Sequence, residues 1–170
     1  MEDLNETESL LAANRAFYAA FAGGDFGTME ALWLGHGEPS RADEETVPGT
    51  DPGTGPGTAA EAPVITCIHP GAPPHVGHAA VMAVWFDLLQ APPAIRCGPA
   101  RAVQYGATGL VVCIEQIDEH RLAATNVFHR VAGVWRMVHH QAGPIQLIAD
   151  GGEDGGGGTA GGQADGPAVH

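Results

Sequence analysis

The sequence predicts one α+β domain in which helices come first and an antiparallel sheet follows. Three strand-like segments, 110–117, 121–131 and 134–141, are separated by short polar or glycine-containing turns, which is the pattern of a meander. The helical segments precede this meander and do not alternate with its strands, which is typical of α+β folds. We therefore expect a curved antiparallel sheet wrapped around about three helices, forming a cone with an internal pocket.

The first two predicted helices are joined by a glycine pair. Residues 6–22 carry an apolar stripe at helical spacing, formed by Leu10, Leu11, Asn14, Phe17, Tyr18 and Phe21. Gly23 and Gly24 favour the left-handed conformation that ends a helix. Asp25 can then cap a short second helix that carries Met29, Leu32 and Trp33.

A short β-branched strand, 64–68, and a third helix, 77–90, follow in the middle of the chain. The pair Pro92 and Pro93 stops this helix. Residues 95–105 read as a strand, and Pro99 inside it predicts a bulge or an edge position because proline cannot donate to a β-ladder. Residues 106–109 are expected to turn the chain into the meander.

Composition excludes several classes of partner. The net charge is −13, and the seven basic residues are all scattered arginines, so neither nucleic acid nor an acidic membrane is an expected partner. No apolar run is long enough to span a membrane, and the acidic N-terminus lacks a signal pattern, so we expect a cytoplasmic protein. The three cysteines are widely spaced and have no Cys-x-x-Cys motif, which favours buried reduced thiols.

The predicted domain covers residues 1–148 and contains one low-complexity insertion. Residues 36–62 are rich in Gly, Pro, Thr and acidic residues and have no hydrophobic period, which predicts a flexible surface loop or a lid over the pocket. Residues 149–170 are mostly glycine with acidic residues. This tail is expected to be disordered, because it buries too little apolar surface to offset its ordering entropy.

Several motifs occur along this order: Phe17-Tyr18, Gly24-Asp25, Cys67-Ile68-His69-Pro70-Gly71, Gly77 with Trp85, Asn126-Val127-Phe128-His129-Arg130 and Gly133 to His140. With these motifs the chain resembles the nuclear transport factor 2-like superfamily, and more closely its SnoaL-like branch of small bacterial proteins. The resemblance covers roughly 6–148, interrupted by the insertion. It implies a pocket open at one end of the cone and a homodimer packed through the outer face of the sheet. The fold hosts isomerases, cyclases, dehydratases and non-catalytic modules.

Three residues are candidates for catalysis. His69 stands before a strand-ending proline, where the steroid isomerase branch has its general base, and histidine exchanges protons near neutral pH. Asn126 is a lone amide in an apolar strand and could donate to an oxyanion. A two-residue turn at 132–133 would place His139 opposite Asn126, whereas a three-residue turn would favour His140, and we select His139.

Each candidate also has a structural interpretation. His69 could hydrogen-bond backbone at a strand end, Asn126 could be a satisfied core amide, and His139 could lie at a dimer interface or in the core. The residues expected to line the pocket are aromatic: Phe17, Tyr18, Trp33, Trp85, Phe128 and Trp135. His75 and His78 are three residues apart near His69, but no second cluster has recognised ligand spacing and no Cys pairs with them. No cofactor motif occurs either, so neither a metal nor a cofactor is expected.

Two functions fit these observations. The first is binding of a small apolar, carbonyl-bearing molecule, with cofactor-independent general acid–base catalysis of an isomerase, cyclase or dehydratase type. His69 would act as base, Asn126 as oxyanion donor and His139 as a second proton donor. The alternative is a non-catalytic ligand-binding or dimeric assembly module of the same fold.

Overall fold

The structure, a computed structural model, describes residues 2–35 and 64–145. The expected insertion at 36–62 and the expected tail at 149–170 lie outside the described residues. The helices are α1 (Glu2–Gly23), α2 (Phe26–Leu32) and α3 (His78–Leu89). The strands are β1 (Thr66–Ile68), β2 (His75–Val76), β3 (Ile95–Cys97), β4 (Arg101–Tyr105), β5 (Thr108–Ile117), β6 (His120–Val131) and β7 (Val134–Pro144). The predicted α+β class and its meander are confirmed.

The first two helices meet where the sequence predicts, but α2 ends at Leu32, and Trp33, which was expected within it, is an extended residue that bridges to Met137. Gly24 follows α1 with a φ of 64°, a left-handed conformation that glycine adopts without steric cost. Asp25 caps α2, because its carboxylate accepts a hydrogen bond from the backbone N–H of Thr28 at 3.0 Å. The hydrogen bond replaces one of the backbone partners that every helix start lacks.

The sheet has the order β2-β1-β7-β6-β5-β3, and β4 pairs with β5 beside β3. Its pairs are antiparallel except for β1 and β7, which run parallel. The predicted strand 95–105 is two strands, because the chain breaks at Pro99 and Gly98 N–H instead donates to Ile114 O at 2.8 Å. Strand β2 was not predicted from the sequence; it pairs with β1 where a loop was expected.

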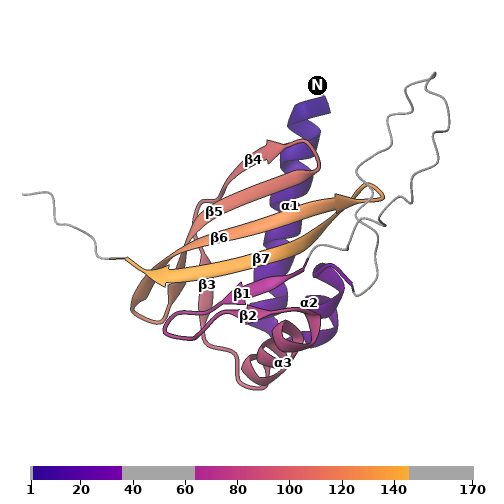
Figure 1. Ribbon diagram of the computed structural model, residues 1–170. Helices are drawn as coiled ribbons and strands as arrows, with labels where there is room; N and C mark the ends of the chain where they lie inside the picture. Colours follow the sequence, from indigo (N-terminus) through magenta and orange to yellow (C-terminus); the bar gives the residue numbers. More distant parts are fainter. Residues whose placement is uncertain (1, 36–63, 146–170) are drawn as a thin grey trace, which may run out of the picture.

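Figure 1 shows α1 running behind the sheet across β5, β6 and β7, with α2 and α3 gathered near β1 and β2. Helix α1 packs tightly against β5 at Gly109, where an added Cβ would lie 2.5 Å from Cδ2 of Leu10. The inner face of the sheet is therefore covered by helices. On the opposite face Val112 and Ile114 are about 40% exposed. No helix within residues 2–35 and 64–145 is long and apolar enough to cross a membrane.

Candidate functional site

The β6–β7 hairpin decides which histidine enters the core. Its turn has two residues, Ala132 and Gly133, both with positive φ, as the turn typical of such hairpins requires. The register then shifts, because Phe128 pairs with Met137 while Val127 pairs with His139. Val138 is the extra residue of this β-bulge, and a bulge reverses the facing of every later side chain.

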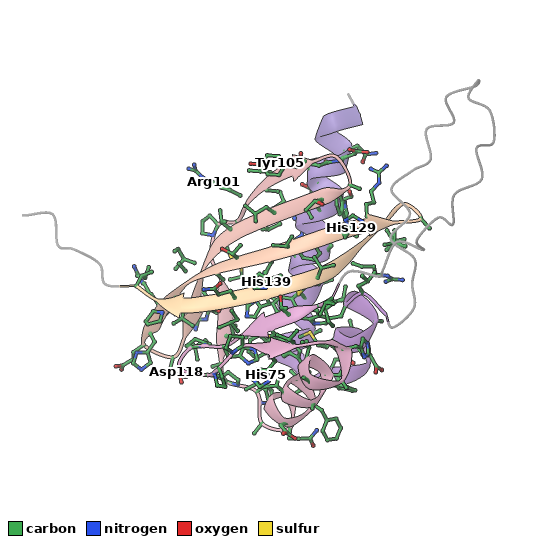
Figure 2. All side chains as sticks on the ribbon, in the orientation of Figure 1. His75, Arg101, Tyr105, Asp118, His129 and His139 are labelled. Atoms are coloured by element: carbon green, nitrogen blue, oxygen red, sulfur yellow. The ribbon has the colours of Figure 1, made fainter. Side chains whose placement is uncertain are left out.

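Asn126 consequently lies opposite His140 and not His139, which corrects the sequence-based placement. His140 is 1% exposed, and its Nδ1 lies 2.6 Å from Oδ1 of Asn126. His139 is only partly buried and faces the other side of the sheet, where its Nδ1 lies 2.7 Å from Oγ1 of Thr66. Figure 2 labels His139 on β7. The turn length was predicted correctly, but the bulge that follows it was not.

A chain of hydrogen bonds crosses the core from β7 to α1. Asn126 Nδ2 donates to Oδ1 of Asn14 at 2.7 Å and to the hydroxyl of Tyr18 at 3.3 Å. The Tyr18 hydroxyl donates in turn to Oε1 of Glu115 at 2.6 Å. Oε1 of Glu115 is also 4.0 Å from Nε2 of His140. We call Asn14, Tyr18, Glu115, Asn126 and His140 the polar cluster.

Burial pushes the titratable members of the polar cluster toward their neutral forms. Glu115 is 1% exposed, and loss of hydration raises the pKa of its carboxyl, although the Tyr18 hydrogen bond acts in the opposite direction. Burial holds the pKa of His140 well below its usual value, and the charges of His69 and His139 add to this effect. The pKa of Tyr18 is raised by burial and by the charge of Glu115. A carboxyl with a raised pKa is a stronger proton acceptor once ionised.

A cavity of about 450 Å³ lies between α1 and the β3–β4 segment. Its lining consists of Leu11, Asn14, Arg15, Tyr18, Ala19, Cys97, Gly98 and Ala100. Two members of the polar cluster, Asn14 and Tyr18, therefore form part of its wall. A cavity of this size can hold a small organic molecule.

Of the six residues expected to line a pocket, Tyr18 alone lines this cavity. The other five are packed in the core with exposures between 0% and 5%: Phe17, Trp33, Trp85, Phe128 and Trp135. The Trp135 indole N–H donates to Oγ of Ser9 at 3.0 Å. The indole nitrogens of Trp33 and Trp85 have no hydrogen-bond partner among the described residues.

His69 lies at the end of β1, among aromatic rings. Its ring centroid is 4.8 Å from that of Trp85 and 5.7 Å from that of His140. Its Nε2 is 3.5 Å from Sγ of Cys67. Burial, followed by the charge of His75, lowers the pKa of His69 to about 4. His69 is therefore a neutral imidazole at neutral pH, close to the polar cluster but absent from the cavity lining.

The three thiols remain free cysteines. Cys97 lines the cavity, and Cys113 lies 3.2 Å from the Tyr18 hydroxyl. Burial raises the pKa of Cys67 to about 12, which makes its thiol a poor nucleophile. Within the described ranges, no three His, Cys, Asp or Glu side chains are grouped so that they could hold a metal ion.

Two residues that the sequence analysis did not select belong to the site. Glu115 follows Val111 and Cys113 at every second position of β5, so the alternation already placed it on the buried face. An acidic residue at such a position is rare enough to indicate a special role. Asn14 belonged to the predicted apolar stripe of α1 as its single polar member. Both signals could have been found without a structure.

Comparison with known proteins agrees with this architecture. A model of the SnoaL-like domain family matches residues 58–145. A "putative dehydratase" of the nuclear transport factor 2-like family from Streptomyces avermitilis is similar at 28% identity, with a TM-score of 0.68, over 86% of this chain and 100% of that chain. A search of curated proteins found no significant match.

Two further solved structures are similar. A "putative calcium/calmodulin-dependent protein kinase type II association domain" from Thiobacillus denitrificans is 27% identical, with a TM-score of 0.58, over 79% of this chain and 94% of that chain. A protein with a cystatin-like fold from Caulobacter vibrioides is 12% identical, with a TM-score of 0.60, over 82% of this chain and 89% of that chain, and shows the fold alone. The chain belongs to the SnoaL-like domain family of the nuclear transport factor 2-like superfamily.

Proposed function

We propose that this protein binds a small, mostly apolar, carbonyl-bearing molecule in the cavity beside α1 and removes a proton from the carbon next to the carbonyl. The observation that carries this proposal is the position of Tyr18. Its side chain lines the cavity, and its hydroxyl donates at 2.6 Å to Glu115, a carboxyl that is 1% exposed. Buried groups with shifted pKa values beside a cavity are frequent at catalytic sites.

Tyr18 and Glu115 can act together as a base. As the substrate carbon gives its proton to the Tyr18 oxygen, the original hydroxyl proton of Tyr18 passes to the ionised Glu115. Tyr18 is unchanged, Glu115 becomes a neutral carboxylic acid, and the substrate becomes an enolate. The raised pKa of Glu115 favours this transfer.

The enolate could then follow two routes. A proton returned to another carbon gives an isomer. Alternatively, a hydroxyl group on the carbon next to the deprotonated carbon leaves with its bonding electrons and takes up the proton held by Glu115 through Tyr18, so that water and a dehydrated product form and the Glu115 carboxylate is regenerated. The Streptomyces relative, which is named for dehydration, supports the second route. The cavity wall contains Leu11, Ala19 and Ala100, which suits an apolar substrate skeleton.

Exchange of α-hydrogens for deuterium tests the proposal without knowledge of the natural substrate. The probe is 2-tetralone, a bicyclic ketone, and NMR in D₂O follows its α-hydrogens. The wild-type protein should accelerate exchange above the buffer rate, and Tyr18→Phe and Glu115→Gln should each lower that acceleration about a hundredfold. His69→Ala in the same assay tests the sequence-based prediction that His69 is the base.

Binding of 2-tetralone without accelerated exchange would contradict the catalytic proposal and favour the alternative, a ligand-binding module. The relative named as a kinase association domain is consistent with an assembly role for this fold. A hollow of about 290 Å³ on the outer face of the sheet is bordered by the exposed Val112 and Ile114.

We further propose that a second copy of the chain covers this outer face. Apolar side chains on the solvent side of a sheet are typical of a surface that is buried in an assembly. Ile114→Lys should convert a dimer into a monomer in analytical ultracentrifugation, while Phe86→Lys, an exposed position on α3 away from this face, should not. A wild-type protein that sediments as a monomer at all concentrations would contradict the proposal.

A further inference from the structure

Asn14 joins the cavity to the polar cluster. It is 1% exposed, yet it forms part of the cavity wall. Its carbonyl oxygen accepts from Asn126, so its NH₂ group points the other way, with two N–H donors available. Among the described residues, this NH₂ group donates to Sγ of Cys97 at 4.0 Å, and sulfur at this distance is a weak acceptor. A buried donor with so poor a partner is stabilised by any ligand that supplies an oxygen acceptor.

The hydrogen-bond geometry fixes the orientation of both amides. The Tyr18 hydroxyl donates its hydrogen bond to Glu115, so toward Asn126 the Tyr18 oxygen can only accept. The Asn126 atom beside it must therefore be the donor Nδ2. Oδ1 of Asn126 then faces Nδ1 of His140 at 2.6 Å and accepts a hydrogen bond from its N–H. His140 is therefore the Nδ1–H tautomer.

Three donors consequently point in one direction. His140 N–H donates to Asn126, Asn126 N–H donates to Asn14, and Nδ2 of Asn14 is directed toward Sγ of Cys97, another residue of the cavity wall, at 4.0 Å. Hydrogen bonds aligned in this way polarise one another, so that each donor strengthens the next. The cavity end of the chain is therefore a stronger donor than an isolated amide.

We infer that Asn14 binds the carbonyl oxygen of the ligand, and that His140 acts on that oxygen from a distance through Asn126 and Asn14. Asn14 is the residue that touches the ligand, and His140 is a positioning residue. This inference rests on the proposed function, because it assigns the oxygen-binding group of the same cavity. It also defines the ligand class: a molecule whose carbonyl oxygen accepts a hydrogen bond and gains negative charge during reaction.

Two probes of the same shape test the inference. 2-Tetralone has the carbonyl oxygen and tetralin does not, so the ratio of their dissociation constants isolates the contribution of the oxygen. Calorimetry should give wild-type protein about a tenfold preference for 2-tetralone. In ¹⁵N-labelled protein the side-chain amide signals of Asn14 and Asn126 should shift with 2-tetralone and stay in place with tetralin.

Variants separate the residues of the relay. Asn14→Asp keeps the acceptor for Asn126 but removes the donor to the cavity, so the preference should disappear. His140→Leu should lower the preference severalfold while leaving tetralin binding unchanged, and His140→Asn, whose Nδ2 takes the place of Nδ1, should restore it by donating to Asn126. His139→Gln is the matched control, because His139 faces the other side of the sheet, and the preference should be retained.

Equal affinity for both probes in the wild-type protein, without amide shifts, would overturn the inference while leaving the cavity as a binding site. Absence of binding by either probe would overturn both the inference and the proposed function. Shifts confined to other residues would place the ligand oxygen elsewhere and also overturn the inference. The wild-type spectra decide among these outcomes even if a variant fails to fold.

Discussion

The interior of this protein has two halves, and they differ in how their polar atoms are used. The half around Trp85 is made of aromatic rings in edge-to-face contact, with Phe17 and Phe21 at centroid distances of 5.4 and 5.0 Å. Two indole nitrogens there have no partner among the described residues. The half around Asn126 is a connected set of hydrogen bonds beside the cavity.

This difference shows how a pocket can be recognised in a fold of this kind. Large aromatic side chains were the obvious candidates for pocket walls, but they fill the dry half of the core. The cavity lies instead beside buried polar side chains, which need partners that a purely apolar core does not offer. Three predictions test this division into an aromatic half and a polar half.

The largest effect is expected in the aromatic half. Trp85→Ala should lower the free energy of unfolding by about 4 kcal/mol, because the indole is 0% exposed and its removal leaves a cavity among close-packed rings. Urea denaturation measures this loss. Phe86→Ala on the same helix is the control and should cost less than about 1 kcal/mol, because Phe86 is 51% exposed. A loss below about 2 kcal/mol for Trp85→Ala would mean that this half is loosely packed.

A second effect is expected at His69, where the two halves meet. Its pKa is about 4 in the folded protein and near 6.5 when exposed, so the unfolded chain binds more protons between these values. The stability contributed by neutral His69 is present above pH 6.5 and is lost as the pH falls toward 4. The full loss is about 3 kcal/mol.

The difference in unfolding free energy between the wild type and His69→Gln, measured from pH 7 to pH 4, isolates this contribution from other titrating groups. The wild type should lose stability faster than the variant across that window. Parallel profiles would show that His69 is hydrated in the folded protein.

The smallest effect is expected in the polar half. Asn126→Ala should lower the unfolding free energy by about 2 kcal/mol, because Asn14 and His140 lose their partner while water from the adjacent cavity can replace part of the bond. Urea denaturation at pH 7 measures it. A loss as large as that of Trp85→Ala would show that water does not reach the polar cluster, and the proposed division between the halves would fail.

Most of the fold could be predicted from local signals in the sequence. Gly24 and Asp25 predicted the junction of the first two helices, and the alternation of apolar and polar residues in β5 and β6 predicted the meander. Strand β2 was missed because two residues carry no measurable period, and its pairing with β1 depends on tertiary contacts. The turn expected at 106–109 is shorter, since β5 already begins at Thr108.

The site was harder to predict, for a different reason. Asn126 was identified because an amide is unusual in an apolar strand, and it does lie at the centre of the polar cluster. Glu115 is likewise a polar residue at an inward-facing position of an apolar strand, but it was not selected from the sequence. The choice between His139 and His140 required the position of a bulge, and no residue near Val138 marks one in the sequence.

The bulge at Val138 affects how the sequence of this chain aligns with those of its relatives. Because Val138 is one additional residue, the side chains of β7 beyond it point to the opposite face of the sheet from the one that an unbulged strand would give them. A relative without the bulge would need a gap of one position here for its core residues to align with His140. A sequence alignment without that gap would match an interior residue of one protein with an outward-facing residue of the other. A single-codon insertion or deletion at this position would therefore change which side chain of β7 lies opposite Asn126, with no substitution in the polar cluster itself.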